Sequence, residues 1–134
     1  MGKFNPVVHF EMPYEDPKRV SEFYSKAFGW GMNDAGEAMG HYITAWTAET
    51  DENRMVKTPG TINGGFYDLN QTQASKEPSV VISVEDINKA MENVKAAGGE
   101  IIGEVQDIPG IGKWVSFRDT EGNRVSLLQA NERG

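Results

Sequence analysis

The sequence contains no cysteine, so disulfide bonds, thiolate metal sites and cysteine nucleophiles are all excluded. It also lacks any apolar run of the roughly 18 residues that a membrane span requires. The N-terminal residues do not show the basic and then apolar pattern of a signal peptide. We therefore expect a cytoplasmic protein with no membrane partner, whose stability comes from packing.

Basic residues are few: 13 lysines and arginines stand against 20 aspartates and glutamates, which gives a net charge of -7. Such a field repels nucleic acid and anionic membranes, so we expect neither as a partner. It favours cationic ligands, although acidic surface residues also keep a protein in solution. The 134 residues, 38% of them hydrophobic, fit a single folded domain over residues 1–134.

The stretch "MPYEDPKRVSEFYSKAFGWG", from Met12 to Gly31, predicts a helix. Asp16 can cap the free N–H groups of the first turn, and Pro17 suits the first helical position because no amide hydrogen is needed there. Gly29 supplies a left-handed ending. Apolar residues recur between them at spacings of three and four, which predicts one buried face: Val20, Phe23, Tyr24, Ala27 and Phe28.

A second stretch, "VEDINKAMENVKAAGGEI", repeats this pattern at a constant shift of 70 residues. Under that shift Asp86 matches Asp16 and Gly99 matches Gly29. The shift also pairs side chains of the same kind: Arg19 with Lys89, Glu22 with Glu92, and Ala27 with Ala97. The repetition indicates an internal duplication.

A strand-like run precedes each helix and three more follow it, so each half is predicted to be a βαβββ module. The polar stretch "NQTQASKEP", from Asn70 to Pro78, is interpreted as a linker between module 1, residues 1–70, and module 2, residues 78–130. The glycines of "INGG" and "IPGIG" are interpreted as turns. The runs are "NPVVHFEM" from Asn5, Met32–Asn33, "GHYITAWT" from Gly40 and "TINGGFYDL" from Thr61, then "PSVVISV" from Pro78, "EIIGEV" from Glu100, "GKWVSF" from Gly112 and "NRVSLLQ" from Asn123.

Alternation along the strands separates side chains that pack on the helices from those on the opposite face. The helix-facing set is predicted to be Val8, Phe10, Met12, Ile43, Ala45, Val115, Phe117, Val125 and Leu127. The opposite face mixes aromatic, hydroxyl and charged groups, which is typical of a ligand site. A face that meets only solvent or a second copy of the chain is the alternative. The set comprises Val7, His9, Glu11, Tyr42, Thr44, Trp46, Trp114, Ser116, Arg118, Arg124, Ser126 and Leu128.

The repeated pattern resembles the vicinal oxygen chelate superfamily, in "HFEMPYEDPKRVSEFYSKAFGW" of the first half and in "VEDINKAMENVKAAGGEII" and "IPGIGKWVSFRDTEGNRVSLLQ" of the second. That superfamily includes glyoxalase, extradiol dioxygenases, and bleomycin and fosfomycin resistance proteins. The resemblance implies an α+β fold in which two tandem βαβββ modules form a curved mixed sheet with a concave cleft. It also implies a homodimer.

Enzymes of that superfamily place His or Glu ligands on the first and last strands of each module, where a divalent metal polarises the substrate. By the resemblance, His9 stands at the first-strand position, with Glu11 as a base or second ligand. The second-module positions hold Ser79 and Ser126, whose neutral hydroxyls are poor ligands for zinc, nickel or iron. Near the remaining position Asp68 is the only carboxylate. We therefore expect no cofactor, with His9 the one ligand candidate should a divalent metal bind.

The preferred interpretation is a glyoxalase- and bleomycin-resistance-like protein that binds a small organic molecule in an aromatic-lined cleft, without the usual metal. The alternative is a lyase, isomerase or dioxygenase that uses an unusual metal set, or acid/base catalysis by His9 and Glu11. A third interpretation has the face filled by its own side chains or by a partner. Besides His9 and Glu11, the residues expected to contact a ligand are Tyr42, Thr44, Trp46, Ser79, Trp114, Ser116, Arg118 and Ser126.

Overall fold

The computed structural model describes residues 4–71 and 76–131, so residues 72–75 of the predicted linker lie outside it. The chain divides into two compact units. The N-terminal unit is His9–Pro78, and the C-terminal unit combines the first eight residues with Ser79–Gly134. The organisation of the whole chain as a single domain stays a prediction.

The N-terminal unit is one βαβββ module. Its elements are β1 (Val7–Tyr14, whose first two residues belong to the other unit), α1 (Pro17–Phe28), β2 (Gly31–Asp34), β3 (Ile43–Trp46) and β4 (Asn63–Asp68), with short 3-10 turns at Glu37–Met39 and Leu69–Gln71. The strands are ordered β2-β3-β4-β1. Strands β1 and β4 are parallel, and the other pairs are antiparallel.

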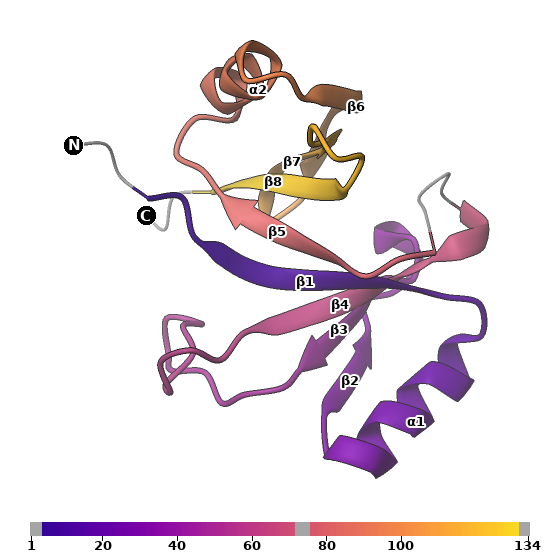
Figure 1. Cartoon of the computed structure of the whole chain (residues 1–134). Coiled ribbons are helices and arrows are strands. Elements are labelled where there is room, and N and C mark those ends of the chain that lie inside the picture. Colours follow the sequence, from indigo (N-terminus) through magenta and orange to yellow (C-terminus); the bar gives the residue numbers. More distant parts are fainter. Residues whose placement is uncertain (1–3, 72–75, 132–134) are drawn as a thin grey trace. The chain divides into compact units, whose positions relative to one another are not determined.

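The C-terminal unit repeats this arrangement. Its elements are β5 (Ser79–Ser83), α2 (Ile87–Ala96), β6 (Glu100–Ile108), β7 (Gly112–Arg118) and β8 (Arg124–Ala130), and its strands are ordered β5-β8-β7-β6. Strands β5 and β8 are parallel, as β1 and β4 are. Figure 1 shows each helix beside strands of its own unit. The predicted α+β class, with two βαβββ modules of mixed strand direction, is confirmed.

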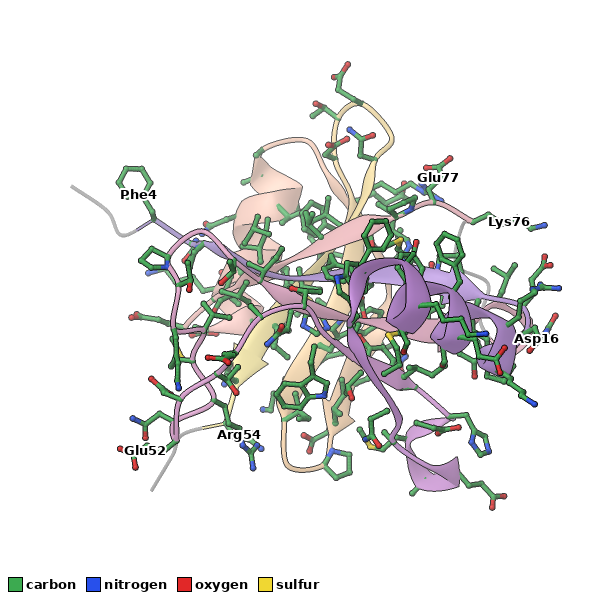
Figure 2. The ribbon with its side chains drawn as sticks, turned by 90° about the horizontal axis from the view of Figure 1, so that it is seen from below. Phe4, Asp16, Glu52, Arg54, Lys76 and Glu77 are labelled. Atoms are coloured by element: carbon green, nitrogen blue, oxygen red, sulfur yellow. The ribbon has the colours of Figure 1, made fainter. Side chains whose placement is uncertain are left out.

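Both helices begin as the sequence predicts. The Asp16 carboxylate accepts the Arg19 N–H at 3.0 Å, and Asp86 accepts the N–H groups of Asn88 and Lys89. Figure 2 shows Asp16 at the start of α1. Helix α1 ends at Gly29, which has the predicted left-handed conformation with φ 73°. Neither helix in the described part of the chain is long and apolar enough to cross a membrane.

Each unit has a core between its helix and one face of its strands. In the C-terminal unit, Val115, Phe117 and Leu127 pack with α2 through Ile87. In the N-terminal unit, Phe66, Ile43 and Ala45 form the buried centre. The partly buried side chains packed around that centre are Phe10, Met12, Val20, Tyr24, Trp30 and Met32. The predicted assignment of faces is therefore right in both units.

Two details of the predicted packing are wrong. Val8 is 40% exposed because it precedes the part of β1 that pairs with β4, which starts at His9. On α1 the predicted apolar face is only partly covered. The helix rests on the strands through Val20 and Tyr24, whereas Phe23 and Phe28 remain 57% and 64% exposed.

Candidate functional site

Three of the predicted site residues form one hydrogen-bonded cluster on the N-terminal unit. The Tyr42 hydroxyl donates to Glu11 Oε2 at 3.2 Å, and its oxygen lies 2.9 Å from His9 Nε2. His9 and Glu11 alternate with Phe10 and Met12 along β1, so they point away from α1. We call this side of the strands, with His9, Glu11, Tyr42, Thr44 and Trp46, the far face.

Tyr42 reaches the two β1 side chains because β4 offers no side chain beneath it. Gly65 pairs with Glu11 on one side and with Thr44 on the other. A methyl group at Gly65 would overlap the Tyr42 ring. On the core side of the sheet, a methyl group at the neighbouring Gly64 would likewise overlap the Phe10 ring. The interpretation of the "INGG" glycines as turns is therefore wrong, because both lie inside β4 where rings cross the strand.

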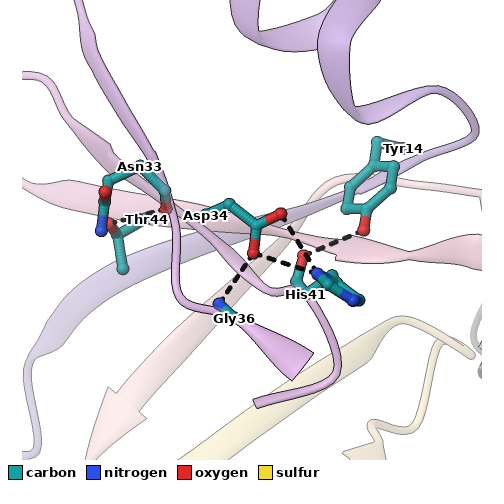
Figure 3. A network of polar contacts seen from close by, with 6 residues as sticks. All are labelled: Tyr14, Asn33, Asp34, Gly36, His41 and Thr44. Atoms are coloured by element: carbon teal, nitrogen blue, oxygen red, sulfur yellow. Dashed lines mark hydrogen bonds and ion pairs between the residues drawn. The ribbon is translucent and has the colours of Figure 1, made fainter. Parts of the chain in front are cut away.

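Polar contacts hold the turn before β3 (Figure 3), and the Tyr42 backbone is bonded to Met39 and Ala35. His41 adopts a left-handed conformation with φ 57°, and the Tyr14 hydroxyl donates to its carbonyl at 2.9 Å. The His41 ring lies 3.2 Å from the Asp34 carboxylate, which also accepts the Gly36 N–H at 2.8 Å. The Gly36 hydrogen bond is the main cause that lowers the pKa of Asp34. This turn is a structural support, and it shortens β3 relative to the predicted run from Gly40.

Burial governs the protonation of the cluster. It raises the pKa of Tyr42 well above its ordinary value, and the adjacent Glu11 carboxylate adds to the shift. Tyr42 therefore stays protonated and donates its hydrogen to Glu11. Burial lowers the pKa of His9 to about 4, so its imidazole is neutral at pH 7. Since the Tyr42 hydrogen is directed at Glu11, the Nε2 atom of His9 carries the hydrogen that Tyr42 accepts.

The lowered pKa of His9 predicts a loss of stability on mild acidification. An unfolded histidine takes up a proton near its ordinary pKa of 6.5, whereas folded His9 resists until about 4. Stability therefore falls as the pH drops through this window, by about 2 kcal/mol between pH 7 and pH 5. Urea denaturation at the two pH values should show that loss in the wild type and a smaller one in His9→Gln. Equal losses in both proteins would contradict the assignment.

The other two predicted residues of the far face lie beside the cluster. The Thr44 hydroxyl donates its hydrogen to the Asn33 carbonyl of β2 at 3.2 Å, so this hydrogen is already bonded within the sheet. Trp46, at the end of β3, is 46% exposed and lies against Gly31. An exposed indole ring of this kind offers a flat apolar surface to a ligand.

In the C-terminal unit, four predicted site residues share the strand face opposite α2: Ser79, Trp114, Ser116 and Ser126. The hydroxyls of Ser116 and Ser126 lie 3.0 Å apart, and the Arg124 guanidinium donates to Ser116 at 2.9 Å. Ser126 is fully buried and Ser79 is 7% exposed. No hydrogen-bond partner for the buried Ser79 hydroxyl is found among the described residues, and the same holds for the Trp114 indole N–H.

Arg118 takes no part in this serine cluster. Its side chain is exposed, and its guanidinium donates to the Gly122 carbonyl at 2.9 Å across the turn between β7 and β8. Arg124 was not among the predicted ligand contacts, yet it is the arginine that reaches the serines. The sequence could have identified Arg124 as a ligand contact. Alternation along β8 places it on the same face as Ser126, just as alternation along β7 places Arg118 with Ser116.

The residues present do not fit a conventional divalent metal. Among residues 4–71 and 76–131, no three His, Asp or Glu side chains gather closely enough to hold an ion. In the N-terminal unit the Tyr42 hydroxyl lies 2.9 Å from His9 Nε2, so a metal ion at this nitrogen would have to displace the hydroxyl. Asp68 lies away from the far face and accepts the Asn70 N–H at 2.9 Å. The expectation of a protein without a metal cofactor stays a prediction.

Comparison with solved structures shows the same fold in other proteins. A hypothetical protein from Bacillus halodurans C-125 shares 17% identity at a TM-score of 0.67, over 98% of this chain and 99% of that one. A Streptomyces coelicolor methylmalonyl-CoA epimerase variant in complex with 2-nitronate-propionyl-CoA shares 10% identity at a TM-score of 0.69, over 97% and 100%. The Mycobacterium tuberculosis methylmalonyl-CoA epimerase shares 13% identity at a TM-score of 0.61, over 98% and 94%. These identities establish the fold alone.

Comparison at the level of sequence gives the family. No curated protein matches the chain. The model of the family described as Glyoxalase/Bleomycin resistance protein/Dioxygenase superfamily matches residues 7–127, which run from the first residue of β1 to the middle of β8. The chain therefore belongs to the Glyoxalase/Bleomycin resistance protein/Dioxygenase superfamily.

Proposed function

We propose that the protein binds a small organic molecule on the far face, without a conventional divalent metal. The observation that carries the proposal is the hydrogen-bonded chain from His9 through Tyr42 to Glu11, on the same strand face as the half-exposed Trp46 ring. Buried polar groups next to an exposed aromatic surface are the usual composition of a ligand site. His9 and Glu11 would supply polar contacts, and Trp46 would stack on the ligand.

The C-terminal unit, taken by itself, carries a second group of buried polar atoms. The hydroxyl of Ser79 and the indole N–H of Trp114 are buried donors, and a buried donor without a partner costs about 1–3 kcal/mol. A ligand with oxygen acceptors would remove that cost. We propose Ser79, Trp114, Ser116 and Ser126 as contacts for a ligand on the C-terminal unit itself, and we propose a cytoplasmic homodimer as the working form.

Two classes of ligand are considered for the site: a cationic compound and an anionic thioester. The net charge of -7 favours a cation, and bleomycin appears in the description of the family. The structural neighbours instead include an epimerase in complex with an anionic coenzyme A thioester. Both compounds therefore belong among the first probes.

Acid/base catalysis by His9 and Glu11 is the second candidate function. The Tyr42 link between the two side chains favours it, because it orients the imidazole as a catalytic partner would. A pKa of about 4 opposes it, since an efficient general base has a pKa near the working pH. Incubating methylmalonyl-CoA with the protein in D2O and following the loss of its α-proton by NMR would detect such a reaction.

Calorimetric titration tests the proposed binding function. Probes should include bleomycin, methylmalonyl-CoA and aromatic carboxylic acids, with the protein dialysed against a chelator. We expect saturable binding of at least one probe and an affinity about tenfold lower in Glu11→Gln. Glu15→Gln is the matched control, because Glu15 is exposed and its ion pair with Lys76 lies at the surface. Equal affinities of the two variants would contradict a site at Glu11.

A further inference from the structure

The C-terminal unit carries buried hydrogen-bond donors on the strand face that points away from α2. Ser79 is 7% exposed, and its hydroxyl has no partner among the described residues. The same holds for the indole N–H of Trp114, whose nitrogen is buried although the residue as a whole is half-buried. Folded proteins rarely leave a buried donor without an acceptor. Both groups therefore indicate an acceptor that comes from outside the described residues.

The serine pair of β7 and β8 supplies a third donor of this kind. Ser116 and Ser126 are opposite each other in the strand register, and their hydroxyl oxygens lie 3.0 Å apart. The Arg124 guanidinium donates to the Ser116 oxygen at 2.9 Å. The two hydroxyls hold two hydrogens, and the bond that joins them uses only one. Whichever serine donates, the hydrogen of the other has no acceptor among the described residues.

Strand pairing places these donors on three adjacent strands. Ser126 of β8 pairs with Val81 of β5 on one side and with Ser116 of β7 on the other. Ser79 precedes Val81 by two residues, so it lies on the same face one step along β5. Trp114 precedes Ser116 by two residues in the same way. Because β5 and β7 run in opposite directions, Ser79 and Trp114 flank the serine pair from opposite ends.

The charge next to the serine pair is positive. Arg124, which is 9% exposed, donates directly to the pair. The strands β5, β7 and β8 contain no aspartate or glutamate. The outer strand β6 adds Glu100 and Glu104, which are exposed and lie two strands away from Arg124. Water and salt screen such exposed carboxylates. A guanidinium beside three hydrogen-bond donors favours an acceptor that is itself negatively charged.

We propose that this patch of the C-terminal unit, formed by Ser79, Trp114, Ser116, Arg124 and Ser126, binds the carboxylate of a small organic acid. The carboxylate oxygens accept hydrogens from the serine pair and its flanking donors, and Arg124 selects the anion over an uncharged analogue. The inference rests on the proposed function, the binding of a small organic molecule. It narrows the two classes of ligand considered there to the anionic one.

NMR titration of the 15N-labelled protein with benzoate, and with its uncharged analogue benzamide, tests the proposal. The indole N–H signal of Trp114 reports on the patch and is assigned by its loss in Trp114→Phe. We expect benzoate to shift this signal saturably and to bind at least tenfold more tightly than benzamide. Arg124→Gln should weaken benzoate about tenfold and benzamide much less. Arg19→Gln, the same change on the exposed surface of α1, should leave both affinities unchanged.

Ser79→Ala separates a binding role from a structural one. It removes a buried hydroxyl that has no partner among the described residues, so the free protein should melt at a temperature at least as high as the wild type. The affinity for benzoate should nevertheless fall about fivefold. Ser25→Ala is the control for binding, because the Ser25 hydroxyl is exposed and donates to the Trp30 carbonyl in the other unit. This pair keeps the test decisive if Arg124→Gln does not fold.

Three results would overturn the proposal. Equal affinities for benzoate and benzamide would mean that the patch takes any oxygen acceptor. An unchanged Trp114 signal at high benzoate concentration would mean that water alone satisfies these donors. A lower melting temperature in Ser79→Ala would mean that this hydroxyl is bonded within the fold. In each case, saturable binding of any probe in the calorimetric titration leaves the proposed function standing, whereas the absence of binding by every probe refutes both.

Discussion

Replacement of Phe66 by alanine should lower the free energy of unfolding of the N-terminal unit by about 3–5 kcal/mol. Phe66 is 1% exposed and is the largest fully buried side chain in the described residues. Its ring meets Phe10 edge-on and lies 5.2 Å from the ring centre of Tyr24 on α1. Alanine therefore leaves a cavity between the strands and the helix. Urea denaturation followed by circular dichroism measures the loss.

Phe23→Ala is the matched control for this change. It removes the same atoms from a side chain that is 57% exposed, so it should cost much less than Phe66→Ala. Similar losses for the two variants would mean that Phe23 is buried as deeply as Phe66 in solution. That result would contradict both the described core and the exposure of Phe23.

Gly65→Ala should be the most damaging single substitution at the far face. The new methyl group would overlap the Tyr42 ring, which must leave its position between His9 and Glu11. Overpacking and the loss of the Tyr42 hydrogen bonds together predict a destabilisation of about 3 kcal/mol. Any ligand bound through Glu11 should lose at least tenfold in affinity, as measured by calorimetry.

Two further variants make the Gly65 test specific. Gly31→Ala adds a methyl group in ordinary contact with Trp46, at 3.4 Å, and should change stability little. Gly65→Ala combined with Tyr42→Ser removes the ring that causes the overlap. The pair should then be less destabilised than the sum of the two single variants. Additive losses would mean that Tyr42 does not occupy the space above Gly65.

The sequence was sufficient for those parts of the fold that depend on local signals. Asp16 and Asp86 precede apolar residues at helical spacing, and both cap their helices as predicted. Alternation along the strands correctly separated Phe10 and Met12 from His9 and Glu11. These signals work because each depends on a few neighbouring residues and not on contacts that are distant in the chain.

The candidate site was only partly predictable, because it depends on contacts between distant strands. His9, Glu11 and Tyr42 were assigned to one face, but nothing local shows that the Tyr42 hydroxyl joins the other two. That link requires the glycine at position 65 in a third strand. The support of the turn by Asp34, His41 and Tyr14 is likewise formed by residues up to 27 apart in sequence. The exposure of Phe23 could not be predicted for another reason. Helical periodicity identifies an apolar face, but it does not show which of its residues the rest of the protein covers.

On the far face, one tyrosine hydroxyl joins the side chains of His9 and Glu11. Tyr42 donates to Glu11 and lies 2.9 Å from His9 Nε2, so the cluster links a neutral imidazole to a carboxylate through one hydroxyl. This arrangement suits recognition of an organic molecule by hydrogen bonds and stacking. It does not suit a ligand set in which His9 Nε2 binds a divalent ion.

Metal titration tests this account most directly. The untagged protein and His9→Ala are dialysed against a chelator, titrated with zinc, nickel, manganese and iron(II), and analysed for bound metal by elemental analysis. The account predicts no stoichiometric metal in either protein, together with unchanged affinity for any small-molecule probe when metal is added. One metal ion per chain in the wild type, lost in His9→Ala, would contradict it and assign the far face to metal-dependent chemistry.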